Sequence, residues 1–313
     1  MTLKSLFMEI IDDLKKSRFV SDSTVVTIGN FDGIHKGHIS LIDKTLELSQ
    51  KKDMTPLVIT FDPLPQEYFT VKNFFRLMTI SDKIEYFKSR GIEIVVKIPF
   101  KEEFSKITAN SFIKDLLIKQ LNIKHLVIGE DFRFGHNRQG NCELLRSHID
   151  FETHVMKNIV NQNNKISSTS IRNLIRSGEI EKANKFLYHN FSMQGCIVHG
   201  EKLGRKLGYP TANIEIYKSF PINGIFLVKV HIEKNTHFGL ASIGNKPTFS
   251  GEKDLLEVFI FDFNQDIYNK IMKVSFLKKL RNQIKFSGEK ELIAQMNQDY
   301  NNAKEILSDK NGL

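Results

Sequence analysis

The sequence has few cysteines and no long apolar run. Its two cysteines, Cys142 and Cys196, are far apart and fit no Cys-x-x-Cys spacing, so neither a disulfide scaffold nor a zinc site is indicated. No stretch reaches the roughly 18 consecutive apolar residues of a membrane-spanning helix. No basic run interleaved with aromatic residues marks a nucleic-acid surface. We therefore expect a cytoplasmic protein without a membrane or nucleic-acid partner.

The composition is that of a globular protein with an excess of positive charge. With 313 residues, 41% hydrophobic and 26% charged, the chain is long enough for two domains with their own cores. The net charge of +9 is dispersed, and small phosphorylated ligands, or no partner at all, explain it as well as a larger anionic partner. At the N-terminus, apolar residues at helical spacing predict an amphipathic helix over residues 1–16 rather than a signal peptide.

In the first half of the chain, apolar segments alternate with segments of helical spacing. Continuous apolar strands between amphipathic helices predict a parallel sheet covered on both faces, whose ligands bind beyond the carboxyl ends of the strands. Ser81 is predicted to cap one of these helices, and Gly91 to end it. The expected strands are 25–28, 57–61, 92–98, 125–128 and 151–159, and the expected helices are 39–51, 81–90 and 109–121.

From about Asn190 the pattern changes to short strands with glycine-bearing turns. Five or six strands without intervening helices predict an antiparallel barrel, and Ser287–Leu307 predicts one closing helix. The expected strands are 193–198, 225–232, 238–243, 255–263 and 271–277. No Ser/Gly linker separates the halves, so we place the boundary between domains of residues 1–186 and 187–313.

The stretch Gly29–His38 is the strongest chemical motif of the first half. An apolar strand runs into a loop with three glycines, and His35 and His38 follow one helical turn apart, where a helix begins. Glycines allow backbone amides to approach a ligand, and the helix start offers unpaired amides to phosphate. A tight connection with two solvated histidines is the alternative, but the histidine pair favours nucleotide chemistry.

Three further segments belong to the same predicted pocket. Asp62–Pro65 and Gly129–Gly135 follow expected strands, so they lie at the same sheet edge. In Ser167–Arg172, hydroxyls and an arginine open another helix. Helix capping alone accounts for these hydroxyls, although the same groups also suit triphosphate oxygens. Together the segments predict sites for a nucleotide and a second anionic ligand.

In the second half, Gly200–Asn213 is glycine-rich and basic and ends in a hydroxyl and an amide. On an extended segment Thr211 and Asn213 project to the same side, where their neutral oxygens suit Mg²⁺ together with phosphates and water. Glu257 stands in an otherwise apolar strand, which usually means a solvent-facing position. If it faces inward near Thr211 and Asn213, it is a candidate general base for a substrate hydroxyl.

These segments together resemble the prokaryotic bifunctional riboflavin kinase/FAD synthetase family over nearly the whole chain. A His-x-x-His pair alone is common among nucleotidyltransferases, whereas the ordered set of motifs is specific. The matching segments are Gly29–His38, Thr60–Pro63, Gly129–Gly135, Ser167–Arg172, Gly204–Asn213, Pro247–Phe249 and Leu277–Arg281. The resemblance implies a Rossmann-like nucleotidyltransferase domain followed by a small antiparallel β-barrel riboflavin kinase domain with a C-terminal helix.

For the N-terminal domain, the resemblance implies transfer of AMP from ATP to FMN, giving FAD and pyrophosphate. His35 and His38 are implied as catalytic residues that steady the triphosphate, while Asp62, Pro63 and Asp131 are implied to bind the flavin. The implied nucleotide-binding residues are Gly29, Phe31, Asp32, Gly33, His35, His38, Ser168, Thr169 and Arg172.

For the C-terminal domain, the resemblance implies ATP-dependent phosphorylation of riboflavin. Glu257 is implied as the catalytic base, and Thr211 and Asn213 as the ligands of Mg²⁺. The implied phosphate-binding residues are Gly204 and Lys206, and the implied flavin-binding residue is Arg281. Leu64, Phe226, Phe259 and Asn269 depart from the family pattern without removing any of these residues.

We expect both activities, with riboflavin, FMN and ATP as the small-molecule partners and a monomer or weak homo-oligomer as the assembly. One alternative is a single-function member in which one site is degenerate. Another is a non-catalytic flavin- or RNA-binding regulator that keeps the fold.

Overall fold

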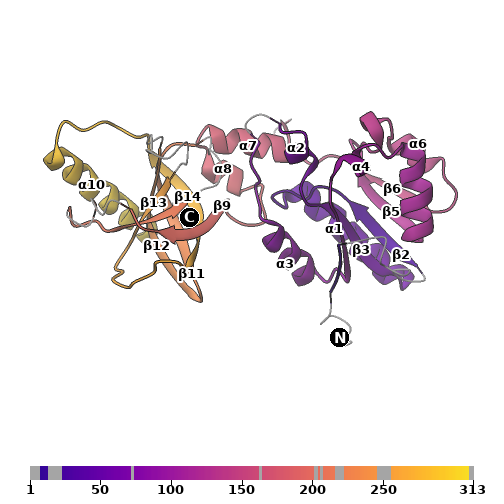
Figure 1. Cartoon of the computed structure of the whole chain (residues 1–313), viewed down its shortest axis with the longest axis horizontal. Coiled ribbons are helices and arrows are strands. Elements are labelled where there is room, and N and C mark those ends of the chain that lie inside the picture. Colours follow the sequence, from indigo (N-terminus) through magenta and orange to yellow (C-terminus); the bar gives the residue numbers. More distant parts are fainter. Residues whose placement is uncertain are drawn as a thin grey trace. The chain divides into compact units, whose positions relative to one another are not determined.

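The structure, a computed structural model, describes residues 8–12, 23–71, 74–161, 164–200, 204, 207–215, 222–244 and 255–309. The chain divides into two compact units, Met1–Ser168 and Thr169–Leu313, each with its own internal contacts. Figure 1 labels the helices and strands of both units. No helix in the described ranges is long and apolar enough to cross a membrane.

The first unit is built on a six-stranded sheet in the order β1-β4-β3-β2-β5-β6. All of its strand pairs are parallel, which confirms the predicted parallel sheet. Its strands are β1 (Glu9–Ile11), β2 (Thr24–Ile28), β3 (Thr55–Phe61), β4 (Ile94–Ile98), β5 (Ile123–Gly129) and β6 (Glu152–Met156). A separate two-stranded ribbon pairs β7 (Val160–Asn161) with β8 (Asn164–Lys165).

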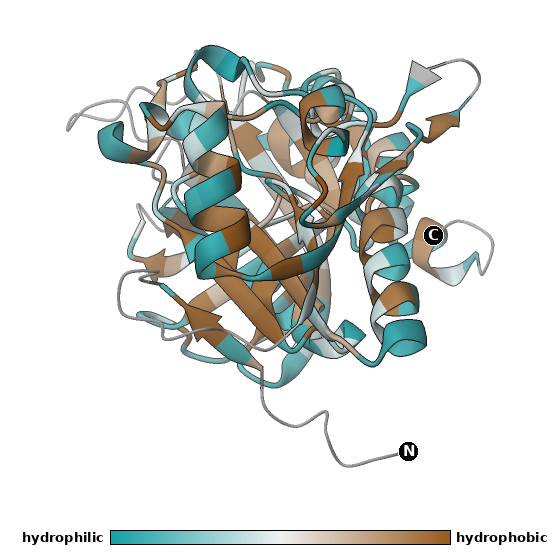
Figure 2. Ribbon diagram, turned by 90° about the vertical axis from the view of Figure 1, so that its right-hand side faces the viewer, coloured by the Kyte–Doolittle hydropathy of each residue, from teal (hydrophilic) through white to brown (hydrophobic). Residues whose placement is uncertain are grey.

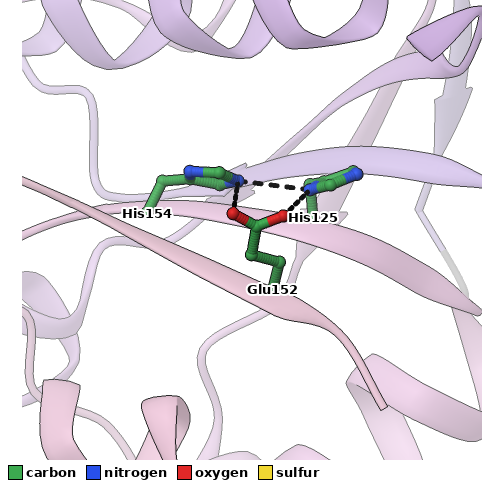
Figure 3. A group of neighbouring side chains, drawn as sticks. All are labelled: His125, Glu152 and His154. Atoms are coloured by element: carbon green, nitrogen blue, oxygen red, sulfur yellow. Dashed lines mark hydrogen bonds and ion pairs between the residues drawn. The ribbon is translucent and has the colours of Figure 1, made fainter. Parts of the chain in front are cut away.

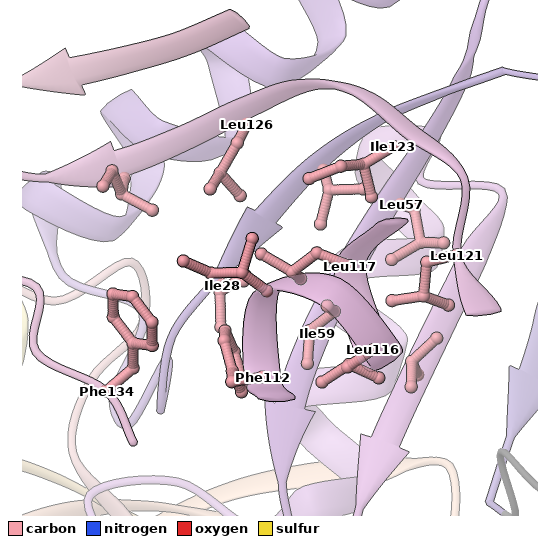
Figure 4. Packing of buried hydrophobic residues seen from close by; sticks show 14 of the residues in the cluster. Ile28, Leu57, Ile59, Phe112, Leu116, Leu117, Leu121, Ile123, Leu126 and Phe134 are labelled. Carbon is pink, nitrogen blue, oxygen red and sulfur yellow. The ribbon is translucent and has the colours of Figure 1, made fainter. Parts of the chain in front are cut away.

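Helices cover both faces of this sheet, because alternate side chains of each strand point to opposite faces. One core contains Ile28, Leu126 and the π-helical segment η2 (Phe112–Gln120), as Figure 4 shows. The opposite core joins Val25 and Val127 to α1 (Lys36–Lys52) and α3 (Ile80–Arg90). In Figure 2 the strands are largely hydrophobic, whereas the helices have one hydrophobic and one hydrophilic side. The shorter helices are α2 (Pro65–Tyr68), α4 (Glu102–Ser105), α5 (Ala109–Ser111), η3 (His136–Arg138) and α6 (Cys142–Arg146).

Two local predictions in this unit are wrong. Glu9–Ile11 is a strand rather than part of an amphipathic helix, because its backbone pairs with Ile94–Val96 and Ile11 is buried in the core. The cap of α3 is Thr79 rather than Ser81, since the Thr79 side chain accepts a hydrogen bond from the Asp82 amide at 3.1 Å. The predicted end at Gly91 is confirmed by its left-handed φ of 90°.

The second unit contains a closed six-stranded barrel in the order β10-β13-β12-β11-β14-β9. All six pairings are antiparallel, as predicted. The strands are β9 (Ser192–Val198), β10 (Thr211–Glu215), β11 (Gly224–Ile232), β12 (Asn235–Gly244), β13 (Leu255–Ile260) and β14 (Ile271–Arg281). Buried alternate residues such as Val228, Val258 and Val274 fill the barrel, so its interior is a packed core.

Two short helices, α7 (Ser168–Arg176) and α8 (Ile180–Asn184), precede the barrel. The Asn184 side chain donates to the Phe276 carbonyl at 2.8 Å and accepts from the Phe191 amide at 2.8 Å, which ties α8 to β14. Helix α8 therefore belongs to the second unit, together with the barrel. The functional boundary at 186/187 stays a prediction.

The closing helix α10 (Glu289–Ser308) is held on the barrel by a buried ion pair. The Arg281 side chain, at the end of β14, donates to Asp299 from Nε at 2.9 Å and from Nη2 at 2.7 Å. The Gln295 side chain donates a further hydrogen bond to the same carboxylate at 3.0 Å. Tyr300 and Ala303 pack beside it against Leu240 of β12, so the helix covers part of the outer barrel face.

Replacing Asp299 by alanine should destabilise the second unit by about 3 kcal/mol, because the guanidinium of Arg281 would stay largely buried without its carboxylate. Urea unfolding followed by circular dichroism measures this change. The matched control is Asp262→Ala, which removes the exposed partner of Lys304 on the same helix and should have much less effect. Equal effects of the two substitutions would contradict this role for Asp299.

Candidate active sites

The loop between β2 and α1 folds tightly at the carboxyl end of the parallel sheet. Its backbone is left-handed at Phe31 (φ 47°), Gly33 (φ 87°) and Ile34 (φ 43°). This conformation suits glycine and is strained for the other two residues. Both are fully buried, and Phe31 contacts Phe87 of α3 edge-on at 5.4 Å between ring centroids. Core packing therefore fixes a loop that its local conformational preferences alone would not form.

His35 and His38 meet at the start of α1, as their spacing predicts. His35 is the N-cap, and its Nδ1 accepts the amide of His38 at 3.4 Å. The two rings stack, with 3.6 Å between centroids and 18° between planes. His35 is buried, which excludes the alternative of two solvated histidines. The pair stands where the first amides of a 17-residue helix point outward.

His38 is neutral at physiological pH. Burial lowers its pKa well below the ordinary value of 6.5, and the neighbouring positive charges of His35 and Lys83 lower it further. Its Nδ1 is buried and has no hydrogen-bond partner among the residues that the structure describes. A buried imidazole nitrogen without a partner is costly, and such sites concentrate where a ligand binds.

Lys83 is a residue of this site that the sequence interpretation missed. Its side chain is 1% exposed, and its Nζ donates to the Asn30 carbonyl at 2.7 Å, which holds the loop before Phe31. A second contact reaches Thr60 Oγ1 at 3.4 Å. The signal was present, because Lys83 lies at helical spacing between Ile80 and Phe87 on the inner side of α3.

Burial lowers the pKa of Lys83 to about 8, from an ordinary value of 10.5. The nearby carboxylates of Asp32, Asp62 and Glu67 oppose this shift, whereas Arg76 adds to it. Between about pH 8 and 10.5, the native lysine has lost its proton while the unfolded lysine still holds one. Unfolding then takes up a proton, so the free energy of unfolding rises with pH across this window.

We expect this rise to amount to roughly 3 kcal/mol, at about 1.4 kcal/mol per pKa unit, and to be absent from Lys83→Met. Urea unfolding of both proteins at a series of pH values between 8 and 10.5 measures the difference. Exposed lysines contribute equally to both proteins and cancel. Parallel pH profiles for the two would show that Lys83 does not titrate in this window.

Asp32 and Ser168 lie together, as the predicted pocket requires. The Asp32 side chain is 1% exposed and accepts the Leu77 amide at 3.0 Å. The Ser168 hydroxyl donates to the Asp32 carbonyl at 2.9 Å. Ser168 is the first residue of α7, and Thr169 and Arg172 follow on that helix, exposed and buried respectively. Their expected roles at the triphosphate stay predictions.

The two predicted flavin-binding carboxylates both have cationic partners. Asp62, which precedes the exposed Pro63 at the end of β3, pairs with Arg76 at 2.6 Å. Glu67 pairs with the same guanidinium at 2.5 Å. Asp131, beyond the end of β5, is exposed and pairs with Lys165. Because β3 and β5 are parallel to the same central strand, both carboxylates lie at the carboxyl edge of the sheet.

An aromatic cluster at this edge was also missed by the sequence interpretation. Phe100, which follows β4, contacts four other rings at centroid distances of 5.6–5.9 Å. The four are Phe61, Tyr68, Phe69 and Phe104. Phe69 is 60% exposed, so the cluster opens to solvent beside Asp62. Such a surface suits a flat aromatic ligand.

In the second unit, the barrel register brings the predicted kinase residues together. Asn213 of β10 is paired directly with Glu257 of β13, and Thr211 lies two residues before Asn213 on the same strand face. Directly opposed residues have Cβ atoms about 5 Å apart, so the amide and the carboxylate are neighbours. Asn213 is 8% exposed, and Glu257 is half-buried.

Glu257 lies beside Asn213 but on the outer face of its strand, the position that a glutamate in an apolar strand usually takes. The neighbouring residues Leu256 and Val258 are fully buried and fill the barrel, so Glu257 points to the outer face. On that face the next residue along, Phe259, packs against the cluster that includes Tyr300 of α10. The three polar residues therefore form an outer site between the strands and the segment that precedes β10.

That segment approaches the polar residues closely. A Cβ added at Gly200 would stand 2.1 Å from the Asn213 side-chain nitrogen, and one at Gly204 would stand 2.3 Å from the Tyr209 carbonyl and 3.4 Å from Thr211 Oγ1. At Gly204 a side chain would meet backbone, so glycine is required there, whereas a side chain at Gly200 would displace the Asn213 amide. The Tyr209 amide donates to the Gly204 carbonyl at 2.8 Å, which folds the segment back on itself. Lys206 lies outside the described residues.

A cavity of about 340 Å³ adjoins Thr211. Ile197, Val258 and Ile260, on the inner face of the barrel strands, supply an apolar wall, and the segment that links β13 to β14 supplies a rim of polar and apolar residues. The residues of this rim are Phe263, Asn264, Gln265, Asp266, Ile267 and Tyr268. An apolar slot with a few amide groups is the usual form of a small-molecule site.

Arg281 is placed differently from the other predicted site residues. Its guanidinium donates to Asp299 and to the Asn282 carbonyl, so its visible role is to hold α10. Its expected contact with a flavin stays a prediction.

Comparisons with known proteins match each half of the chain to a known domain family. A family model described as FAD synthetase matches residues 18–170, and one described as riboflavin kinase matches residues 187–307. A bifunctional riboflavin kinase/FMN adenylyltransferase of Buchnera aphidicola subsp. Schizaphis graminum is 40% identical over 310 residues, 96% of this chain and 99% of that protein. The protein of the same name from Haemophilus influenzae is 36% identical over 307 residues, 96% of this chain and all of that protein.

Among solved structures, one from Streptococcus pneumoniae titled a macrolide-efflux protein is 31% identical to this chain. It has a TM-score of 0.84 and covers 96% of this chain and 99% of its own. Together, the two family models and the near full-length relatives show that the chain belongs to the bifunctional riboflavin kinase/FMN adenylyltransferase family.

Proposed function

We propose that this chain phosphorylates riboflavin to FMN in its barrel unit and adenylylates FMN to FAD at the carboxyl edge of its parallel sheet. The observation that carries the kinase assignment is the direct pairing of Asn213 with Glu257, on one face with Thr211. For the adenylyltransferase, the corresponding observation is the stacked pair of His35 and His38 at a helix start.

In the kinase site, the oxygen of the ribityl 5′-hydroxyl attacks the γ-phosphorus of ATP, and Glu257 accepts the proton of that hydroxyl. The bond to the β-phosphate oxygen breaks, and ADP leaves. The cavity beside Thr211 suits the adenine base, because its apolar wall accepts a flat ring and Asn264 and Gln265 offer amides to the ring nitrogens. The phosphates would then lie toward Gly204 and Thr211.

The residues around Asn213 fit Mg²⁺. A hydroxyl, an amide oxygen and a carboxylate share one strand face, and these hard oxygen donors suit an ion that keeps waters and phosphate oxygens in its shell. Thr211 and Asn213 would hold the ion, which neutralises phosphate charge when bound. The backbone at Gly200 lies close against the Asn213 amide, which limits the space available to that side chain.

In the adenylyltransferase site, an oxygen of the FMN phosphate attacks the α-phosphorus of ATP, and pyrophosphate leaves. The chain needs no nucleophile of its own, because alignment and charge stabilisation carry such transfers. Neutral His38 donates one N–H to the phosphates, and the N-terminal amides of α1 add positive potential. The Phe100 cluster would stack the flavin ring beside Asp62.

A single assay tests both activities. Purified protein is incubated with riboflavin, ATP and Mg²⁺, and FMN and FAD are separated by chromatography. We expect FMN to appear first and FAD to follow. If the protein makes FAD from supplied FMN but no FMN from riboflavin, only the adenylyltransferase activity is present. If it makes FMN from riboflavin but no FAD, only the kinase activity is present. No turnover with salt-sensitive RNA binding would favour a regulator instead.

A further inference from the structure

A cluster of metal-ligating side chains lies at the amino end of the parallel sheet, away from the predicted nucleotide loop at its carboxyl end. His125 is near the start of β5, and Glu152 and His154 are the first and third residues of β6. The parallel register pairs His125 with Glu152 and Val127 with His154, so the three side chains share one face of the sheet. Figure 3 shows them converging on a common point.

The three ligand groups are spaced closely enough to share one metal ion, with each imidazole near one oxygen of the carboxylate. Nδ1 of His125 is 3.2 Å from Nε2 of His154 and 3.4 Å from a carboxylate oxygen of Glu152. The other oxygen of that carboxylate is 3.7 Å from His154. Zinc bonds to imidazole nitrogen and carboxylate oxygen are about 2.0–2.1 Å long, and tetrahedral angles then separate the ligand atoms by about 3.3–3.4 Å.

The environment suits a bound ion with one open position. The side chain of His125 is 9% exposed and that of His154 is 19% exposed, whereas Glu152 is 64% exposed, so solvent reaches the fourth position from the carboxylate side. The nearest lysine, Lys44, is paired with Glu47 at 3.1 Å.

We propose that His125, Glu152 and His154 form a binding site for a divalent transition-metal ion, best matched by Zn²⁺, that ties the edge strand β6 to β5. Two imidazoles, one carboxylate and a water complete the coordination that zinc prefers. The site is separate from the Mg²⁺ site proposed in the barrel and does not depend on either proposed activity.

The test compares zinc binding by the full-length protein with binding by His154→Ala and by Glu152→Gln, measured by calorimetry against a competing chelator. Glu152→Gln keeps the size and hydrogen-bonding capacity of an exposed side chain, so it separates a metal site from a hydrogen-bonded trio. The matched control is His148→Ala, which removes another partly buried histidine of the same unit.

We expect the wild type and His148→Ala to bind one more equivalent of Zn²⁺ than His154→Ala, and Glu152→Gln to bind it at least about tenfold more weakly. Zinc should raise the unfolding temperature of the wild type and leave that of His154→Ala unchanged. Co²⁺, used as a spectroscopic probe, should give the absorption bands of tetrahedral cobalt in the wild type but not in His154→Ala. Equal zinc stoichiometry and affinity in the wild type and both site variants would overturn the proposal.

Discussion

Glu257→Gln should lose riboflavin phosphorylation while FMN adenylylation survives. The amide keeps the shape of the side chain and its place opposite Asn213 but cannot accept the hydroxyl proton. Loss of a general base typically lowers kcat by about 10²–10⁴-fold. The KM for riboflavin should change little, because the substitution removes an interaction made mainly in the transition state. Initial rates of FMN formation from riboflavin, and of FAD formation from supplied FMN, measure the two activities separately.

The matched control is Glu233→Gln, which changes another glutamate of the barrel, exposed in the turn between β11 and β12. It should leave both rates unchanged. If Glu257→Gln keeps its kinase rate, the base is another group. If a folded Glu257→Gln loses both activities, the assignment of two separate sites fails.

His38→Ala should give the opposite result, with FMN accumulating and FAD formation lost. Alanine removes the N–H donor and the ring that stacks on His35, at the point where charge develops on the transferred phosphoryl group. Removing one such donor typically costs about 10²–10³-fold in kcat. The same chromatographic assay, started from riboflavin, should show FMN without FAD.

His148→Ala is the control for this change, because it removes a histidine of the same unit outside the predicted pocket. Since His38 also packs against Phe31 at 5.2 Å, His38→Asn provides a variant that retains a polar side chain of smaller volume. FAD production at the normal rate by His38→Ala would contradict the role assigned to this residue. Weak FAD formation by His38→Asn beside none by His38→Ala would support a donor role.

The sequence was informative wherever a local pattern is sufficient. Continuous apolar strands between amphipathic helices predicted the parallel sheet, and alternating short strands predicted the barrel. The spacing of one helical turn between His35 and His38 predicted that they lie together at the start of a helix, as they do. By contrast, Glu9–Ile11 became a strand because the edge of β4 was available for pairing, which is a tertiary effect.

Residues far apart in the chain could be placed together only by the register of the strands. The period of a strand puts Thr211 and Asn213 on one face, but it does not say that Glu257 stands opposite Asn213. The same is true of His125 and Glu152, because no cysteine or short-range spacing in the sequence indicates that these two residues form a cluster. Lys83 is an intermediate case, because the sequence indicates its position on the inner side of a helix but not its contact with Asn30.

By itself, the sequence determined the two folds, the family and the polar residues available for chemistry, because period, capping and motif order are local properties. Tertiary structure decided which of those residues meet. It turned Glu257 to the outer barrel face, since Leu256 and Val258 fill the interior. It also paired Arg281 with Asp299 and buried Lys83 beside the loop between β2 and α1. Packing and register, which depend on the whole fold, decided these contacts.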